Sequence, residues 1–145
     1  MELQILRTRH PPDIYLAQLA ELLRAEGVHV LDEKQVFQRI EDLPKEDRLL
    51  MAVRGETLLG YAHLRISKSI SRNPAAEVVA IIVRLDCRRQ GIGRRLIAAA
   101  ETWARQAGRA HLLLHTEVIR TEAHAFYSAL GYEKSATSIE FQRDL

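Results

Sequence analysis

The residues that could do chemistry gather just after Val83, where two glycines stand among arginines in the run Arg88-Arg89-Gln90-Gly91-Ile92-Gly93-Arg94. Glycine leaves the backbone open to a ligand because it carries no side chain. When such a run opens a helix, the first N–H groups have no partner within that helix, and the helix dipole makes this end positive. Arginine adds charge that suits phosphate. The run therefore favours a site for a phosphate-bearing ligand.

The elements on either side of this loop have to hold it in place. The apolar, mostly β-branched run from Val78 to Val83 predicts a strand that is buried on both faces. After the loop, apolar residues recur with the spacing of one helix face, at Ile92, Leu96, Ile97, Ala100, Trp103, Ala104 and Ala107. Gly108 stands where a helix often ends in a left-handed residue. The sequence thus predicts a strand, a glycine-bearing loop and a long helix.

Two familiar phosphate-binding motifs do not fit this loop. A Rossmann fingerprint needs a third small residue three positions after the second glycine, and that position holds Leu96. A Walker A loop needs lysine and then serine or threonine after its last glycine, whereas Gly93 is followed by Arg94-Arg95. A lone pair of glycines is also compatible with a plain turn between a strand and a helix.

The spacing of Arg88, Gly91 and Gly93 resembles the acetyl-coenzyme A motif of the GNAT (Gcn5-related) N-acetyltransferases, which reads Gln or Arg, two residues, Gly, one residue, Gly or Ala. This resemblance implies that backbone N–H groups bind the coenzyme pyrophosphate at Arg88, Arg89, Gln90, Gly91, Ile92, Gly93 and Arg94. It implies pantetheine and thioester contacts at Ile81, Ile82 and Val83. The chain departs from the family at Leu85, Cys87 and Arg89, where Pro, an aromatic residue and Gly are frequent; none of these changes removes a backbone donor.

A second segment, from Arg120 to Tyr132, resembles a later motif of the same family, with matches at Ala123, Tyr127, Leu130, Gly131 and Tyr132. The resemblance implies that Tyr127 contacts the coenzyme and acts as general acid toward the leaving thiolate. By helical spacing alone, Tyr127 would be a packing residue beside Phe126. Arg120 departs from the asparagine that is usual in the family, so the coenzyme contact of that asparagine is not transferred to it.

Glu77 matches the position of the catalytic glutamate in the family's histone acetyltransferases, which implies a general base; a solvated glutamate at the start of the strand is the alternative. His115 and Glu117 are the other candidates. His63 is expected to pack or to face solvent.

Cys87 is the single cysteine, which excludes an internal disulfide, and we expect direct transfer without an acyl-enzyme. The histidines and acids show no metal-ligand spacing, so no metal is expected.

The predicted elements run β-α-α-β-β-β-α-β-α-β-β, which is the order that the GNAT fold requires. We therefore expect an α/β (α+β) fold: a central mixed, mostly antiparallel sheet of six or seven strands, flanked by about four helices, with splayed central parallel strands. The expected strands include 49–54, 57–66 and 110–116 and a final antiparallel pair at 132–134 and 138–142, and a loop is expected over 67–74. The length of 145 residues predicts one domain over 1–145.

Composition narrows the choice of function. The chain has 21 basic and 19 acidic residues and a net charge of +2, which is far from the strongly basic footprint of a dedicated nucleic-acid binder. No apolar run reaches the length of a membrane span, and the N-terminus has no signal-peptide pattern. We expect a cytoplasmic protein without nucleic-acid or membrane partners.

The resemblance implies an acetyl-coenzyme A-dependent N-acetyltransferase whose acceptor is a primary amine on a small molecule, a protein lysine or a protein N-terminus. A non-catalytic acyl-coenzyme A-binding or sensing module is the alternative, and it would need neither Tyr127 nor a base. A homodimer is compatible with the family, although the sequence carries no interface pattern. The sequence does not identify the acceptor.

Overall fold

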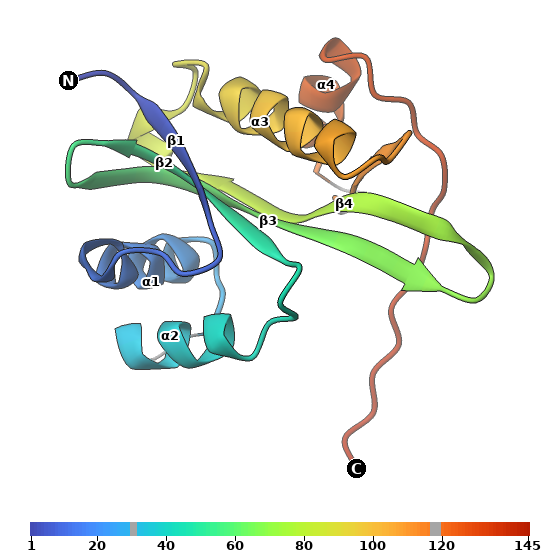
Figure 1. Ribbon diagram of the computed structural model, residues 1–145, viewed down its shortest axis with the longest axis horizontal. Helices are drawn as coiled ribbons and strands as arrows, with labels where there is room; N and C mark the ends of the chain where they lie inside the picture. The colour runs from blue at the N-terminus through green and yellow to red at the C-terminus, as the bar shows by residue number, and fades with distance from the viewer. Residues whose placement is uncertain (30–31, 117–119) are drawn as a thin grey trace. The chain divides into compact units, whose positions relative to one another are not determined.

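The computed structural model describes residues 1–29, 32–116 and 120–145. The chain forms two compact units, Met1–His115 and Thr116–Leu145, and each is described by itself. The first unit contains, in chain order, β1 (Gln4–Thr8), the 3-10 turn η1 (Asp13–Tyr15), α1 (Leu16–Ala25), α2 (Glu33–Glu41), β2 (Arg48–Arg54), β3 (Thr57–Ser69), β4 (Arg72–Val83), η2 (Leu85–Cys87), α3 (Ile92–Gln106) and β5 (Leu112–Leu114) (Figure 1). The second unit contains α4 (Thr121–Ala129).

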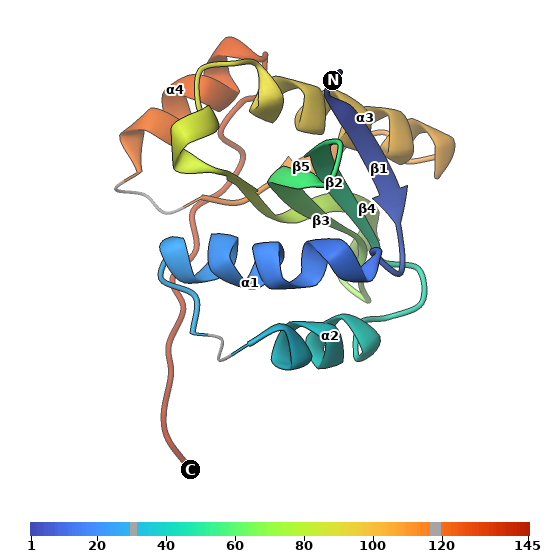
Figure 2. The ribbon, with the colours of Figure 1, turned by 90° about the vertical axis from the view of Figure 1, so that its left-hand side faces the viewer.

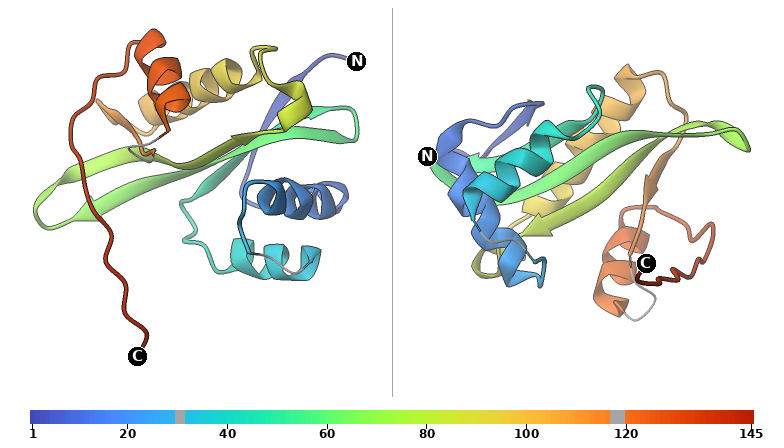
Figure 3. Two further views of the ribbon diagram at one scale, coloured as in Figure 1. Left: turned by 180° about the vertical axis from the view of Figure 1, so that it is seen from behind. Right: turned by 90° about the horizontal axis from the view of Figure 1, so that it is seen from below.

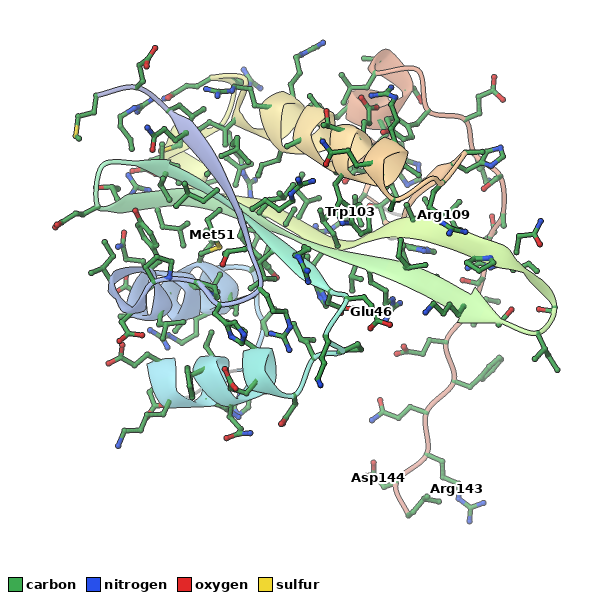
Figure 4. All side chains as sticks on the ribbon, viewed as in Figure 1. Glu46, Met51, Trp103, Arg109, Arg143 and Asp144 are labelled. Atoms are coloured by element: carbon green, nitrogen blue, oxygen red, sulfur yellow. The ribbon has the colours of Figure 1, made fainter. Side chains whose placement is uncertain are left out.

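The first unit is built on a five-stranded sheet in the order β1-β2-β3-β4-β5, antiparallel except for the parallel pair β4 and β5. Helices α1 and α2 cover one face and α3 covers the other (Figure 2). Met51 belongs to the apolar cluster on the α1 and α2 face, and Trp103 belongs to the cluster under α3 (Figure 4). The expected mixed, mostly antiparallel α/β architecture is confirmed, with five strands instead of six or seven.

Local sequence explains where the helices begin and end. Asp32 caps α2, because its side chain accepts a hydrogen bond from the Gln35 backbone N–H at 3.1 Å. The predicted apolar stripe of α3 is confirmed, with Leu96, Ala100 and Trp103 among its buried residues. Gly108 follows the end of α3 with a φ of 73°, a left-handed conformation that glycine adopts without strain.

Strand β4 contains one extra residue, and this bulge changes which side chains face α1 and α2. Along the β3–β4 ladder, His63 pairs with Ala80 but Leu64 pairs with Val78, so Val79 has no partner of its own. Ala80 packs on the α1 and α2 side, whereas Val78 packs under α3. Since side chains alternate along a strand, the bulge places Glu77 on the same face as Ala80.

The sheet departs from the sequence prediction at its second hairpin and at the C-terminal end. Residues 67–74, predicted as a loop, instead extend β3 and β4 into a long hairpin (Figure 3). Glu77 therefore lies within β4 and not at its start. The predicted strands at 132–134 and 138–142 are absent, since residues 133–145 form no regular structure. Ile139 and Phe141 alternate as in a strand but are exposed, and two apolar positions are too few to offset the entropy of ordering the segment. Within the described residues, no helix is long and apolar enough to span a membrane.

Gly60 allows β3 and β4 to approach closely where the pantetheine contacts are expected. A Cβ atom at Gly60 would lie 2.8 Å from the Ile82 carbonyl oxygen and 3.3 Å from the Val83 Cα. We predict that Gly60→Ala lowers the free energy of unfolding by roughly 1–3 kcal/mol, measured by urea denaturation, because the backbone of β4 has to move. Without this contact, alanine in a strand interior would be more stable than glycine by roughly 0.5–1 kcal/mol, so a stabilised variant would contradict the close approach.

Candidate active site

The N-terminus of α3 has no side-chain cap. Its N-cap residue is Gly91, whose φ of 81° lies in the left-handed region, and the first backbone bond of the helix runs from Arg95 N–H to the Gly91 carbonyl at 3.1 Å. The N–H groups of Ile92, Gly93 and Arg94 therefore have no partner within the helix. A Cβ added at Gly91 would meet no atom of the described chain within 4 Å, so open space lies beside this turn. The helix start combines free donors, positive dipole potential and access for an anion.

The turn before α3 is held by its own hydrogen bonds. The Arg84 guanidinium donates to both oxygens of Asp86, at 2.7 and 3.0 Å, and lowers the pKa of that carboxyl. The Arg84 backbone N–H donates to the Leu59 carbonyl at 2.8 Å, which ties the turn to β3. Cys87 is buried, and burial raises the pKa of its thiol. A protonated, buried thiol is a weak nucleophile, which supports the expectation of direct transfer.

The arginines of the loop differ in what they contact. Arg88 donates to the Val83 carbonyl at 3.3 Å and pairs with the Glu26 carboxylate, which follows the last residue of α1. Arg95 donates to a backbone carbonyl near the N-terminus. Arg89 and Arg94 are exposed and make no hydrogen bond or ion pair within the described part of the chain. An anion at the start of α3 would meet the charge of Arg89 and Arg94 without competition, but would compete with Glu26 for Arg88.

Arg89 has a backbone conformation that is unfavourable for its side chain. Its φ is 66°, and it is the one residue other than glycine with a positive φ among the residues described. The Cβ atom makes this region costly for residues other than glycine. Arg89 stands where the related motif often has glycine, so the structure explains that preference: the turn needs a left-handed residue at this position.

Beyond the bulge, strand β4 separates from β5. The two strands pair over Ala76–Val78 and Leu112–Leu114, whereas β3 pairs with β4 as far as Val83. The edge of β4 from Val79 to Val83 that faces away from β3 therefore has no partner strand in the described parts of the chain. Ile81, Ile82 and Val83 are half-buried on this segment. The splay of the central parallel strands, which the family resemblance implied, is present. It leaves backbone donors and acceptors open beside these three residues.

Glu77 is buried and surrounded by basic side chains. The Arg65 guanidinium donates to both of its carboxylate oxygens, at 3.1 to 3.3 Å. His115, just after β5, places Nε2 3.0 Å from Glu77 Oε1. The Glu77 side chain is 7% exposed and that of His115 is 60% exposed. The structure thus brings together two of the predicted candidates for the base, and the third, Glu117, lies outside the described residues.

Sequence reasoning missed a second polar pair on the same face. His63 Nε2 lies 2.7 Å from Asp47 Oδ2, and Asp47 is 3% exposed. His63 was expected to pack or to face solvent, and it does pack, but against a buried carboxylate. Its position two residues before Arg65 on β3 places both side chains on the face that carries Glu77. That alternation was visible in the sequence, whereas the partner Asp47 lies before β2 and could not be inferred from spacing.

Tyr127 lies in the second unit, on α4. Its ring contacts Phe126 at a centroid distance of 5.4 Å and Tyr132 at 6.4 Å. Burial raises the pKa of the Tyr127 hydroxyl, with a smaller opposing effect from Arg120. The phenol therefore stays protonated throughout the neutral range and is able to donate a proton.

No group of three or more histidine, cysteine or acidic side chains among the described residues could hold a metal ion.

Comparison with known proteins identifies the family. A profile of the acetyltransferase (GNAT) family matches residues 16–132. The chain is 34% identical over 115 residues to the IAA acetyltransferase of Azospirillum brasilense, a match that spans 79% of this chain and 69% of the relative. It is 28% identical over 116 residues to an aminoglycoside N(6')-acetyltransferase type 1 of Stenotrophomonas maltophilia, which spans 77% and 75%.

Solved structures share the fold. The aminoglycoside acetyltransferase AAC(6')-Iy in complex with a coenzyme A bisubstrate analogue superposes with a TM-score of 0.81 at 18% identity, and the match covers 100% of both chains. This chain belongs to the GNAT acetyltransferase family. It is an N-acetyltransferase that uses acetyl-coenzyme A as its cosubstrate, as the motif around Gly91 and Gly93 implied.

Arg89 offers a test of the loop geometry. We predict that Arg89→Gly is more stable than Arg89→Ala by about 1 kcal/mol in urea denaturation, since both changes remove the charge but only glycine relieves the positive φ. At Arg94, within the first turn of α3, the order should be reversed: Arg94→Ala should be more stable than Arg94→Gly by about 1 kcal/mol. Equal stability of the two Arg89 variants would contradict a left-handed residue in the loop.

Proposed function

We propose that the N–H groups at the start of α3 bind the pyrophosphate of acetyl-coenzyme A, in the loop that runs from Arg88 through Gly91 and Gly93 to Arg94. The observation that carries this proposal is the glycine N-cap, which leaves the donors of the first turn uncovered. Gln90 and Ile92 contribute backbone groups, and Arg89 and Arg94 contribute charge from exposed side chains. Arg88 joins them when the phosphate displaces Glu26.

The pantetheine arm follows the open edge of β4 beyond the bulge. A chain of amide groups can pair with a strand edge as another strand would, because both present N–H and C=O groups at similar intervals. We expect the thioester to lie beside Ile81, Ile82 and Val83, and the end of the β4–β5 pairing before these residues supports this position. The acetyl carbonyl then meets a backbone N–H of this edge, which stabilises the oxyanion of the tetrahedral intermediate.

The amine must lose a proton before its nitrogen can attack the thioester carbon. We assign the removal of this proton to the pair Glu77 and His115. Both oxygens of Glu77 already accept hydrogen bonds from Arg65, whereas His115 is largely exposed beside them. His115 receives the proton and passes it to solvent, and the Glu77 carboxylate stabilises the imidazolium that forms in between.

Collapse of the tetrahedral intermediate breaks the carbon–sulfur bond and releases the thiolate of coenzyme A. Tyr127 donates its phenolic proton to that sulfur and regains a proton from solvent. The nitrogen, which is cationic after the attack, loses its second proton to solvent, and this leaves the neutral amide. The pKa of Tyr127, raised by burial, keeps the phenol protonated at the pH where the amine reacts. The acetyl group moves directly from sulfur to nitrogen, without a covalent enzyme intermediate.

The relatives bear on the acceptor. Several are named for acetyl transfer to small amines, including aminoglycosides and aminoalkylphosphonates, which supports a small-molecule amine here as well. A protein lysine or N-terminus, a homodimer and a cytoplasmic location stay predictions. Relatives named as acetyltransferases favour catalysis over a non-catalytic acyl-coenzyme A module.

The test is thiol release from acetyl-coenzyme A over a panel of aminoglycosides, polyamines, amino acids and peptides. Coenzyme binding without turnover on any amine would favour the module.

The role of Tyr127 can be tested by removing its hydroxyl alone. We expect Tyr127→Phe to lower kcat by about 100-fold, because general acid catalysis contributes roughly 10²–10⁴-fold, with little change in the affinity for coenzyme A. Tyr132→Phe, the same change on a neighbouring ring, is the control and should keep most of the activity. Since burial raises the pKa of Tyr127 from its ordinary value, deprotonation of this phenol should not lower the wild-type rate in the neutral range. An unaffected Tyr127→Phe variant would rule out this acid.

The proton acceptor can be tested by separate substitutions of the two residues. We expect His115→Gln to lower kcat/KM by roughly 10²-fold, because the group that accepts the proton is removed. Glu77→Gln should lower kcat/KM by a smaller factor, because the imidazole of His115 is kept. His111→Gln, at the other end of β5, is the control for loss of an exposed histidine. A full loss in Glu77→Gln together with an active His115→Gln variant would instead make Glu77 the direct base.

A further inference from the structure

A cavity of about 240 Å³ lies on the α1 and α2 face of the first unit. Aliphatic side chains from both helices form most of its wall, among them Leu19, Leu23, Val36 and Ile40. The floor is the sheet, which contributes Tyr61 and His63 from β3. Nothing in the proposed mechanism uses this cavity so far.

Tyr61 brings an unused hydrogen-bond donor to the cavity. Tyr61 is 8% exposed, and its hydroxyl makes no hydrogen bond within the described residues, whereas the other buried tyrosine, Tyr15, donates to a backbone carbonyl. Every side-chain nitrogen or oxygen that is sealed from solvent in the described chain has a partner, so the Tyr61 hydroxyl opens onto the cavity. Burial raises the pKa of Tyr61 to about 12, so the phenol remains a donor. A buried donor of this kind is normally satisfied by water or by a ligand.

The cavity floor lies on β3, the strand that pairs with the proposed thioester strand β4. Tyr61 pairs with Ile82 and His63 pairs with Ala80, on the stretch of β4 that has separated from β5. Ala80 and Ile82 pack on the α1 and α2 face, which is the face of Glu77. A molecule on the β3 floor of the cavity therefore lies one strand away from the edge of β4 along which the acetyl group is proposed to lie.

We propose that this cavity receives the body of the acceptor, and that the acceptor is a primary amine carrying one compact apolar group, such as a phenyl ring, with a polar atom that reaches the Tyr61 hydroxyl. An engineered apolar cavity of about 150 Å³ binds benzene, so 240 Å³ holds a ring with a short substituent. An amino sugar fits less well, because most of the lining is aliphatic and only Arg39, Tyr61 and His63 offer hydrogen-bond partners to its several hydroxyl groups. This inference rests on the proposed function, since it assigns the acceptor of the same reaction.

The first experiment compares acceptors in the thiol-release assay with saturating acetyl-coenzyme A. The probes are 2-phenylethylamine, 2-(4-methoxyphenyl)ethylamine, glucosamine and spermidine. We expect kcat/KM for both aryl amines to exceed those for glucosamine and spermidine by at least about 10-fold, the discrimination that a group of this size gains from an apolar pocket. A preference for glucosamine or spermidine would overturn the inference.

Two variants test the cavity itself. Val36→Phe fills it from α2 and should raise KM for 2-phenylethylamine about 10-fold without changing the affinity for coenzyme A. Lys34→Phe adds the same ring to an exposed position of α2 and should change neither value. Tyr61→Phe should raise KM for the methoxy probe, whose oxygen can accept a hydrogen bond from the hydroxyl. It should leave KM for 2-phenylethylamine unchanged. Thermal unfolding of each variant shows whether the fold is kept.

The two proposals fail in different ways. Absence of coenzyme A binding in calorimetry, or of transfer to any amine, would contradict the proposed function. The inference alone would be overturned if coenzyme A binds normally and both aryl probes are acetylated, but neither Val36→Phe nor Tyr61→Phe changes their kinetics. The cavity would then be a packing void.

Discussion

One extra residue in β4 determines how the first unit can work. Without the bulge at Val79, the alternation that places Ala80 and Ile82 toward α1 and α2 would also place Val78 there and would turn Glu77 toward α3. The bulge also lies where β4 stops pairing with β5. The same local distortion therefore opens a strand edge for a ligand and places a buried carboxylate on the face from which an amine can approach.

The phosphate end of the site depends on a different local feature. Gly91 and Arg89 both have positive φ values, and together they turn the chain so that α3 begins without a side-chain cap. A side-chain cap such as Asp32, which caps α2, would at the start of α3 occupy the place of the ligand. The glycine N-cap forgoes the stability of a side-chain cap and leaves the donors to an anion. The ion pair of Glu26 and Arg88 links this loop to the end of α1, so the proposed phosphate would compete with a contact that holds these two elements together.

Much of this could be predicted from the sequence, because the relevant signals are local. The β-branched run of β4, the apolar stripe of α3 and the glycines that end helices each reflect the conformational preference of a few neighbouring residues. The motif around Gly91 and Gly93 predicted the family for the same reason. The long β3–β4 hairpin was missed because Ser67 and Asn73 are typical of turns, yet the ladder between Arg72 and Ser69 keeps them in strands. The two final strands were wrong because alternation alone does not supply a pairing partner.

The contacts that shape the acceptor side could not be read from the sequence, since each joins residues that are far apart along the chain. Glu77 meets Arg65 and His115 across three strands, and His63 meets Asp47 from before β2. A carboxylate in either position is stabilised by its basic partner, so these pairs can remain in place although both carboxylates are buried. The coenzyme motif lies at the start of α3, whereas the cavity under α1 and α2 opens from the opposite face of the sheet. On the two proposals, the substrates approach the open edge of β4 from different faces, and the acceptor can change through α1 and α2 without altering the phosphate loop.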